Sequence, residues 1–309
     1  MQIHVLGSAA GGGFPQWNCN HPNSRLARMK APNAKMRTQS SIAVSNDGED
    51  WFLFNASPDL RQQINDNSIL HPKKGLRHSP IQGVVLTNAD VDHVTGLLTL
   101  RESQPLHVYG TQRVLNVLAA NAVFNVLNPQ FVSREAMQLE HPLELRKVDG
   151  SGSGIVVVPF KIPGKVALWL EDATKGPNFG SVDEDTIGLE VRDTGGKTHF
   201  FYIPGCASVP KELAERVRGA PLLLFDGTLW TDDEMIRDKV GIKTGKRMGH
   251  MSVGDPDGTI ATFKDLDIRR KIFIHINTTN PILLEDSPER AACAAAGWEV
   301  SYDGMEISV

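Results

Sequence analysis

The chain has 309 residues, of which 40% are hydrophobic and 22% are charged, a composition typical of soluble globular proteins. A net charge of -4 without any basic block argues against nucleic-acid binding, and the apolar runs are far shorter than a membrane span. Three widely spaced cysteines and an N-terminus without a basic n-region predict a cytoplasmic protein with no disulfide framework.

The apolar pattern predicts strands that alternate with helices in the first half and a strand-rich second half. The predicted strands, in chain order, are 3–6, 41–44, 51–54, 84–86, 106–110, 155–158, 166–170, 187–191, 200–203, 222–225 and 271–274, and a closing hairpin covers 298–309. The predicted helices are 60–64, a helix starting near 94, 111–127, 210–218 and 287–296. The polar, glycine-bearing loop over 171–185 is long enough to be a lid. Two strand-rich halves, each with helices, predict one domain over 1–309 with the αββα four-layer arrangement of the α+β class.

A polar loop with metal-binding side chains follows the buried strand over 84–86. Asp90, Asp92 and His93 stand within four residues of one another, so one turn of the chain can direct all three to a common point. Ligands of open α/β sheets bind at such loops, beyond the carboxyl ends of the strands. The alternative is that the acidic residues only cap the next helix, which Asp residues commonly do.

The same arrangement recurs twice further along the chain. Asp226 ends the apolar run over 222–225, and His275 follows the run over 271–274. His93, His275 and one or more of Asp90, Asp92 and Asp226 therefore make a candidate mononuclear site. Two imidazoles with a carboxylate are the ligands of non-haem Fe(II) oxygenases, and a carboxylate-rich set favours iron, manganese or magnesium without excluding zinc. Taken singly, His275 is typical of a core histidine and Asp226 of a turn residue.

Two residues near the N-terminus form a second candidate. Cys19 and His21 supply a thiolate and an imidazole, both of which bind zinc, but two ligands do not close a tetrahedral site. The alternative is a free cysteine beside a surface histidine.

The order of these residues resembles the metallo-β-lactamase superfamily, whose fold is an αββα sandwich with the metal between its sheets. The hallmark of that superfamily is H-x-H-x-D-H. Here Asn88 and Asp90 stand where the first two histidines would be, whereas Asp92 and His93 match. Cys206 stands where members with two metals carry a bridging Asp. These departures argue against a two-zinc hydrolase.

Within that superfamily the chain resembles the pyrroloquinoline quinone (PQQ) biosynthesis protein B family along essentially its whole length. The resembling stretches are Gly11 to Asn20, Asn55 to Arg61, Thr87 to His93, Asp226 to Trp230, Met248 to Met251 and His275 to Asn277. Members often carry a C-x-C-x-x-C segment, which is taken as a structural zinc site. This chain has Cys19, His21 and Ser24 there, so the resemblance implies a structural zinc held by Cys19, His21 and a further partner.

The resemblance implies a role in PQQ biosynthesis, in the cytoplasm and beside the other proteins of that pathway. The reaction it implies is iron- and dioxygen-dependent hydroxylation of the tyrosine ring in a glutamate–tyrosine precursor, which would make the chain an oxidoreductase. The alternatives are transport of PQQ or its precursor towards the periplasm and metal-dependent hydrolysis.

The substrate implied by the resemblance is a small polycarboxylate, which basic side chains can bind through charge-assisted hydrogen bonds. The candidate substrate-binding residues are Lys243, Lys246, Arg247, His250 and Asn277. The alternative for the basic stretch is a solvated surface loop.

Overall fold

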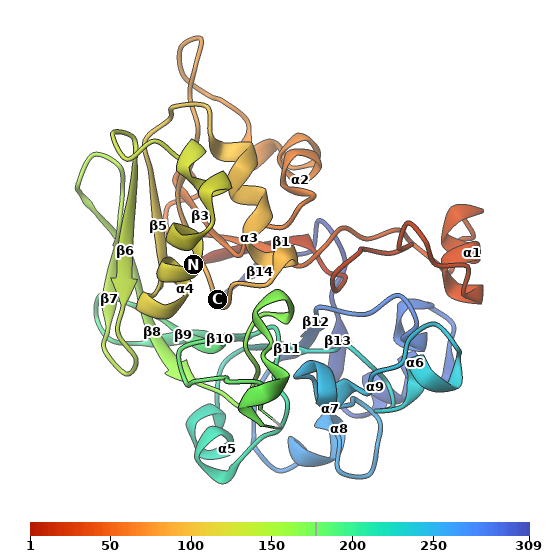
Figure 1. Cartoon of the computed structure of the whole chain (residues 1–309). Helices are drawn as coiled ribbons and strands as arrows, with labels where there is room; N and C mark the ends of the chain where they lie inside the picture. The colour runs from red at the N-terminus through yellow and green to blue at the C-terminus, as the bar shows by residue number, and fades with distance from the viewer. Residues whose placement is uncertain (177) are drawn as a thin grey trace.

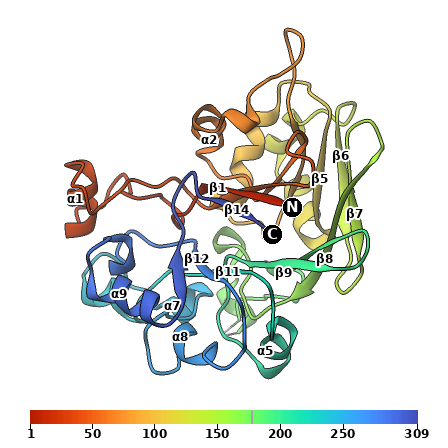
Figure 2. The ribbon, with the colours of Figure 1, turned by 180° about the vertical axis from the view of Figure 1, so that it is seen from behind.

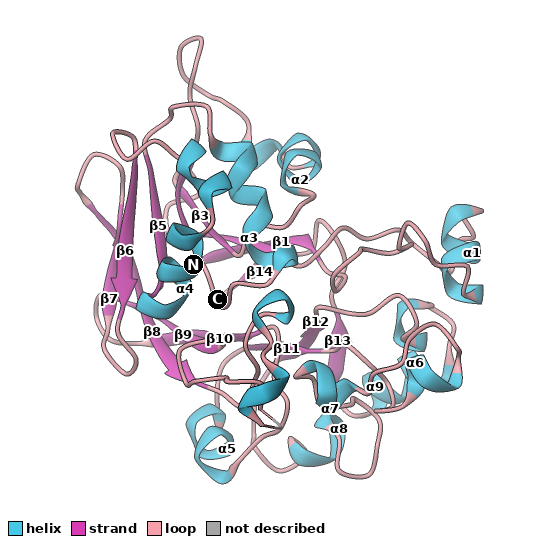
Figure 3. Cartoon of the chain, in the orientation of Figure 1, coloured by secondary structure: helices cyan, strands magenta, loops and turns pink. Residues whose placement is uncertain are grey.

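The computed structural model of the chain describes residues 1–176 and 178–309. Their strands form two seven-stranded sheets, in the order β14-β1-β2-β3-β4-β5-β6 and β13-β12-β11-β10-β9-β8-β7. Figure 1 shows the two sheets with their helices, and Figure 3 shows the same view with helices and strands in separate colours. The metallo-β-lactamase-like αββα sandwich predicted from the sequence is confirmed.

The first sheet contains β1 (Gln2–Gly7), β2 (Ser41–Ser45), β3 (Trp51–Phe54), β4 (Ile81–Val85), β5 (Leu106–Thr111), β6 (Val132–Met137) and β14 (Glu306–Ser308). The second sheet contains β7 (Leu143–Arg146), β8 (Gly152–Lys161), β9 (Ile187–Asp193), β10 (Thr198–Ile203), β11 (Leu223–Asp226), β12 (Lys271–Ile274) and β13 (Trp298–Val300). Strands β3 to β6 pair in parallel in the first sheet, and strands β10 to β13 do so in the second. The remaining neighbours are antiparallel.

The helices are α1 (Pro22–Arg28), α2 (Leu60–Asp66), α3 (Val91–Val94), α4 (Gln112–Ala120), α5 (Lys211–Val217), α6 (Glu234–Arg237), α7 (Gly245–Met248), α8 (Thr259–Thr262) and α9 (Pro288–Ala295). Single 3₁₀ turns cover Ser68–Leu70, Thr95–Leu100, Ala122–Val126, Leu168–Leu170, Ala173–Lys175 and Pro281–Leu283. The reverse view in Figure 2 shows α1 at the end of an extended N-terminal segment and the two chain ends close together. No helix within the described part of the chain has the length and apolar character needed to cross a bilayer.

Alternation along the strands builds one core between the sheets and one on each outer face. In β3, Phe52 and Phe54 face the core between the sheets, whereas Trp51 and Leu53 face the helices that cover the first sheet. Successive side chains of a strand point to opposite faces, so a strand buried on both faces is apolar at every position. The ring of Phe54 lies 5.9 Å from that of Tyr202 in the second sheet, which joins the two sheets.

Several predicted elements differ from the structure, for two physical reasons. The predicted strand over 166–170 is wrong: Leu168–Leu170 is a 3₁₀ turn whose side chains are not buried. The predicted hairpin over 298–309 is also wrong, because β13 pairs with β12 whereas β14 pairs with β1 in the other sheet. An apolar run predicts a strand only if a partner is within reach, and a turn predicts a hairpin only if both arms join one sheet.

The helix boundaries shift as well, and two strands were not predicted. The helix predicted over 111–127 ends at Ala120 and continues as a 3₁₀ turn. Helix α3 begins at Val91, three residues before the predicted start, so it includes Asp92 and His93. Strands β6 and β7 lack a clear apolar signal because polar side chains occupy half of their positions.

Candidate metal centre

The ends of three parallel strands bring the predicted acidic and imidazole groups together. After β4 the chain turns at Asn88 and enters α3, with Asp90 at the N-cap position and Asp92 and His93 in the first turn. In the second sheet, β11 ends at Asp226, and β12 is followed directly by His275. The carboxyl ends of parallel strands lie at one edge of a sheet, which is why residues far apart in sequence meet here.

Asp92, His93 and His275 form the first group. One nitrogen or oxygen atom from each lies within 4.8 Å of the others. His275 Nε2 is 3.1 Å from Asp92 Oδ2, and His93 Nε2 is 3.9 Å from the same oxygen. The spacing of the three atoms is that of ligands arranged around one cation.

The unpaired nitrogen of His93 tests whether a cation fits. Asn88 Oδ1 lies 2.8 Å from His93 Nδ1, and an amide oxygen only accepts, so the ring proton is on Nδ1. Among the described residues nothing hydrogen-bonds to His93 Nε2, which is buried and carries a free lone pair. An unsatisfied buried polar atom costs about 1–3 kcal/mol, which a bound metal would offset. Burial also lowers the pKa of His93, which keeps the imidazole neutral as metal binding requires.

The charges in this group favour an ionised carboxylate. Burial alone would keep Asp92 protonated, but His93 and His275 outweigh it and hold the pKa of Asp92 well below its usual range. Burial likewise opposes a charge on His275, yet its hydrogen bond to Asp92 and the charges of Asp92 and Asp226 raise its pKa. A divalent cation would replace the His275 proton as the positive charge beside Asp92.

Asp226, His250 and His275 form a second group that shares His275 with the first. Asp226 Oδ2 is 2.7 Å from His250 Nδ1 and accepts from the Cys206 backbone N–H at 2.9 Å. Its Oδ1 accepts from the backbone N–H and the hydroxyl of Thr228. Asp226 is thus held by four hydrogen-bond donors. It belongs to the second group, where it fixes the orientation of the adjacent histidine. The Cys206 thiol instead donates to Ser208 O at 3.0 Å and is in neither group.

Thr228 is a site residue that the sequence did not reveal. Its Oγ1 lies 2.6 Å from Asp226 Oδ1, 2.9 Å from His275 Nδ1 and 3.1 Å from His250 Nδ1. A hydroxyl has one proton, and the shortest contact assigns that proton to Asp226. Its lone pairs then accept from His275 Nδ1, so Nε2 of His275 is the atom directed towards Asp92. In the sequence, the only indication that Thr228 belongs to the site was its position two residues after Asp226.

The backbone around His275 is strained. His275 has a φ of 59°, in the left-handed region that non-glycine residues rarely adopt. Strain of this kind costs about 1–3 kcal/mol and is concentrated at functional sites. On the opposite side Gly11 approaches the centre closely, since a Cβ atom there would lie 3.2 Å from Asp92 Oδ2.

Asp90 does not join either group. Its Oδ1 accepts from the Leu168 backbone N–H at 2.9 Å, so it anchors a neighbouring segment.

The candidate substrate-binding residues have partners within the protein. Arg247 makes a two-pronged contact with Glu171, and Lys246 lies 3.1 Å from Asp257. Asn277 donates from Nδ2 to Thr279 Oγ1 at 2.6 Å. Within the described part of the chain, Lys243 has no ion-pair partner.

Cys19 and His21 are not brought together with further ligands. His21 Nε2 is 3.2 Å from Asp238 Oδ2, and the Cys19 sulfur accepts from the His21 backbone N–H at 3.4 Å. Ser24 is bonded to Thr278 through their hydroxyls, 2.7 Å apart. Over residues 1–176 and 178–309, neither Cys19 nor His21 belongs to a group of three metal-binding side chains. The structural zinc at this segment therefore stays a prediction.

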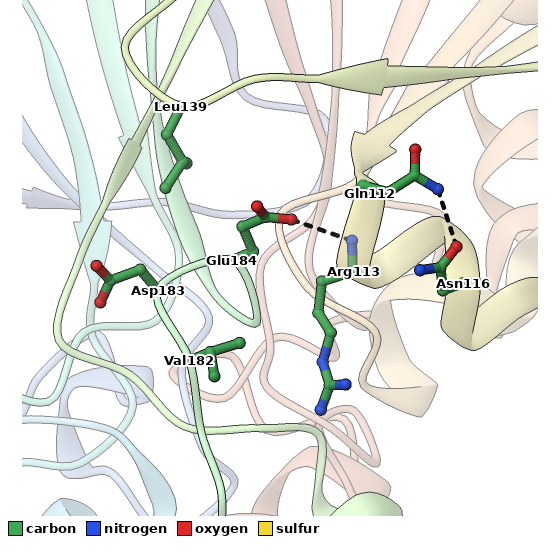
Figure 4. Close-up of a pocket in the computed structure, with 7 residues that line it drawn as sticks. All are labelled: Gln112, Arg113, Asn116, Leu139, Val182, Asp183 and Glu184. Carbon is green, nitrogen blue, oxygen red and sulfur yellow. Dashed lines mark hydrogen bonds between the residues drawn. The ribbon is translucent and has the colours of Figure 1, made fainter.

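A wide surface cavity of about 800 Å³ lies apart from the metal-binding groups. Figure 4 shows its lining, in which Glu184 accepts from the Arg113 backbone N–H at the start of α4. None of the predicted site residues lines it. The chemistry of the side chains, rather than the size of a hollow, locates the candidate site.

Comparisons with known proteins show what the chain is similar to. The model of the β-lactamase superfamily domain matches residues 50–276. The chain is 55% identical to the coenzyme PQQ synthesis protein B of Gluconacetobacter diazotrophicus, over 100% of this chain and 99% of that protein. It is 52% identical to the protein of the same name from Xanthomonas oryzae pv. oryzae, over the full length of both.

Solved structures show the same relationship. The crystal structure of Zn(2+)-bound PqqB from Methylobacterium extorquens superimposes with a TM-score of 0.93, at 50% identity and with 100% of both chains covered. A diphosphatase from the PhnP family superimposes with a TM-score of 0.69 at 19% identity, over 99% of this chain and 96% of that one, which shows the shared fold.

Proposed function

This chain belongs to the coenzyme PQQ synthesis protein B family of the β-lactamase superfamily, and from that premise we propose that it acts in PQQ biosynthesis as a metal-dependent hydroxylase. The proposed reaction is hydroxylation of the tyrosine ring of a glutamate–tyrosine precursor. The proposed metal ligands are Asp92, His93 and His275, with Asp226 holding the adjacent histidines.

The observation that carries the proposal is the bare, buried Nε2 of His93 beside the Asp92 carboxylate and His275. Two neutral imidazoles and one carboxylate on one side of a cation leave its other positions open, as in non-haem Fe(II) oxygenases. Fe(II) bound there supplies the activation of dioxygen. A divalent metal is also supported by the zinc in the Methylobacterium relative, while manganese and magnesium suit the same ligands.

The surrounding residues hold the ligands in place. Asn88 and Thr228 accept the Nδ1 protons of His93 and His275, so both rings present Nε2 to the same point. Outer partners of this kind orient metal-binding histidines and raise their basicity. Gly11 has no side chain, which lets its backbone approach Asp92 closely.

The decisive test is oxygen-dependent turnover with defined metal. The metal-free chain is loaded with Fe(II) under nitrogen and mixed with the precursor and with ascorbate, and oxygen is then admitted. One oxygen atom of O₂ enters the ring, and two electrons from ascorbate with two protons reduce the other to water. We expect a product heavier by one oxygen atom in the mass spectrum, and no product with zinc. Asp92→Asn and His93→Ala should abolish formation of this product. His107→Ala is the control: it removes an imidazole of β5 that is paired with Glu135, and it should leave the product unchanged. Turnover that survives Asp92→Asn would refute the assignment.

A metal-dependent hydrolase is the second candidate, and the second group of Asp226, His250 and His275 is the observation that favours it. Two groups that share His275 would hold two metals. This function predicts two metals per chain and activity without oxygen. Elemental analysis of the loaded protein that finds one metal at the centre would exclude it.

A further inference from the structure

One segment of the chain crosses both halves of the metal centre. We call residues 165–176 and 178–186 the crossing segment. Its Leu168 N–H donates to Asp90, and Trp169 Nε1 donates to Ala89 O at 3.2 Å. At its far end Thr186 forms an isolated bridge with Asn88. The segment is therefore tied at both ends to the loop that carries Asp92 and His93.

The middle of the crossing segment is held by one carboxylate, Glu171. Arg247 Nη1 and Nη2 lie 3.1 and 2.7 Å from its two oxygens, which is the two-pronged geometry of a strong arginine–carboxylate pair. Lys165 Nζ lies 3.3 Å from the same carboxylate. Arg247 also stacks on the ring of Phe179, with 3.7 Å between the guanidinium carbon and the ring centre.

The charges around Glu171 do not balance. Arg247 binds it directly, and Lys165 and Lys243 act on it as well, so three cations surround one anion and hold the pKa of Glu171 at about 2. Within the described part of the chain, Lys243 has no ion pair of its own. The Glu171 and Lys165 side chains are mostly buried, at 11% and 16% exposed, so solvent screens them only in part. The cluster can therefore accept more negative charge than Glu171 supplies.

The cluster lies next to the metal-binding groups. Arg247 is in α7, which ends at Gly249, and the next residue is His250, hydrogen-bonded to Asp226. A Cβ atom on Gly249 would lie 3.1 Å from Lys165 Cγ, so the Lys165 stem packs on the turn between Arg247 and His250. A molecule bound at the centre is thus within reach of the cluster.

The crossing segment is loosely packed. Every residue among 168–176 and 178–184 is at least partly exposed to solvent. Segments with few buried contacts open locally at a small cost in free energy. If a ligand carboxylate took the place of the Glu171 carboxylate, Arg247 and Lys165 would stay paired, so displacement of Glu171 would not leave these two cations without a partner.

We propose that Arg247 and Lys165 form a carboxylate-binding subsite beside the metal centre, filled by Glu171 in the free chain and taken over by a substrate carboxylate that displaces Glu171. The identity of that carboxylate as the precursor's rests on the proposed function. The subsite itself is a binding property and needs no turnover.

The test measures equilibrium binding of glutamyl-tyrosine to the full chain as purified, without oxygen, by calorimetry. We expect Glu171→Gln to tighten binding about tenfold, since one competing carboxylate is removed. Arg247→Gln should weaken binding by a similar factor. In a chain that already carries Arg247→Gln, Glu171→Gln should change the affinity little, because the two residues act as one unit. Asp183→Asn is the matched control: it removes the same charge from the same segment, where Asp183 lies 3.7 Å from Lys161.

A neutral ligand separates recognition of a carboxylate from simple opening of the segment. Glutaminyl-tyrosinamide has the same shape without carboxylates and should gain nothing from Glu171→Gln. An equal gain for this ligand, or no gain for glutamyl-tyrosine, would overturn the proposal. Should Glu171→Gln fold poorly, limited proteolysis of the unsubstituted chain decides: glutamyl-tyrosine should speed cleavage after Lys175, and unchanged cleavage contradicts displacement. None of these measurements depends on metal oxidation, so a failed hydroxylase reaction would leave them valid.

Discussion

Asn88 Oδ1 accepts from both the Asp90 backbone N–H, at 2.9 Å, and Nδ1 of His93, at 2.8 Å. In the superfamily motif this position belongs to a histidine, whereas here its amide oxygen sets the proton of a neighbouring ring. Asn88 therefore holds the turn after β4 in place and also sets the direction of the free nitrogen of His93.

Replacement of Asn88 should weaken metal binding without unfolding the chain. Asn88→Leu removes the acceptor and leaves the His93 ring free to rotate and change tautomer, so we expect a 10–100-fold loss of metal affinity, about the effect of losing an outer partner. Asn88→Asp keeps an acceptor and should stay within a few-fold of the unchanged chain. Competition with a fluorescent chelator measures both affinities. Equal affinities for Leu and Asp at this position would show that the contact does not orient His93.

The hydroxyl of Thr228 provides a second test of the same kind. Thr228→Val keeps the shape, but its side chain cannot hydrogen-bond to Asp226 or to His275, so metal affinity should again fall by about 10–100-fold. Thr228→Ser should restore most of it. With Co²⁺ as a probe, the visible spectrum should change for Val and not for Ser. If both variants bind and absorb like the unchanged chain, Thr228 has no positioning role.

Glu234 should make stability fall as the pH rises. Burial raises the pKa of Glu234 from 4.5 to about 7, against the hydrogen bonds from Thr279 and Trp230. Between these two values the folded chain keeps a proton that the unfolded chain has lost. The stabilising contribution is thus fully present below pH 4.5 and is lost as the pH rises through 7. The loss is at most about 3 kcal/mol.

Urea unfolding from pH 5 to 8 measures this loss as a difference between variants. Glu234→Gln cannot ionise, so its free energy of unfolding should decline less over this range than that of the unchanged chain. Glu102→Gln, at an exposed position, controls for the loss of a carboxylate and should follow the unchanged chain. Parallel curves for Glu234→Gln and the unchanged chain would contradict the raised pKa.

The core between the sheets should be sensitive to loss of volume at Phe54. Its ring is buried against Tyr202 and Phe200 of the opposite sheet, so Phe54→Ala should lower the free energy of unfolding by about 3–5 kcal/mol. Val123→Ala removes methyl groups from a side chain that is 58% exposed and should change it little. Similar losses for the two variants would mean that the sheets do not depend on this contact.

The architecture could be predicted from local sequence patterns, because the strands that form the two sheets are apolar on both faces. The runs ending at Asp226 and before His275 gave the correct strands and the correct positions of both residues. The pairing of β13 and β14 could not be predicted, since the turn between them looks the same whether its arms join one sheet or two. The apolar run at 166–170 misled for a similar reason. Val166 and Ala167 are buried, but Leu168–Leu170 is a partly exposed 3₁₀ turn, and hydrophobicity alone does not reveal whether a run has a strand partner.

The candidate site was predictable only in part. Asp92, His93 and His275 stand out by residue type and by their places after strands. Thr228 does not, because hydroxyls are common in turns and only its distances to Asp226 and His275 distinguish it. The basic stretch at Arg247 was predicted to meet a substrate, but its partner Glu171 lies 76 residues earlier in the chain. Pairings across such separations depend on the completed fold.

The pairing of β1 with β14 bears on how this protein is made. Gln2 pairs with Ser308, so this edge of β1 stays unpaired until residues 306–308 have been synthesised. An unpaired strand edge is a template for aggregation. Such long-range pairing is also slow to form. Nascent chains that still lack β14 should therefore depend on chaperones, and a translational stall just before β14 should be more harmful than a stall between the two sheets.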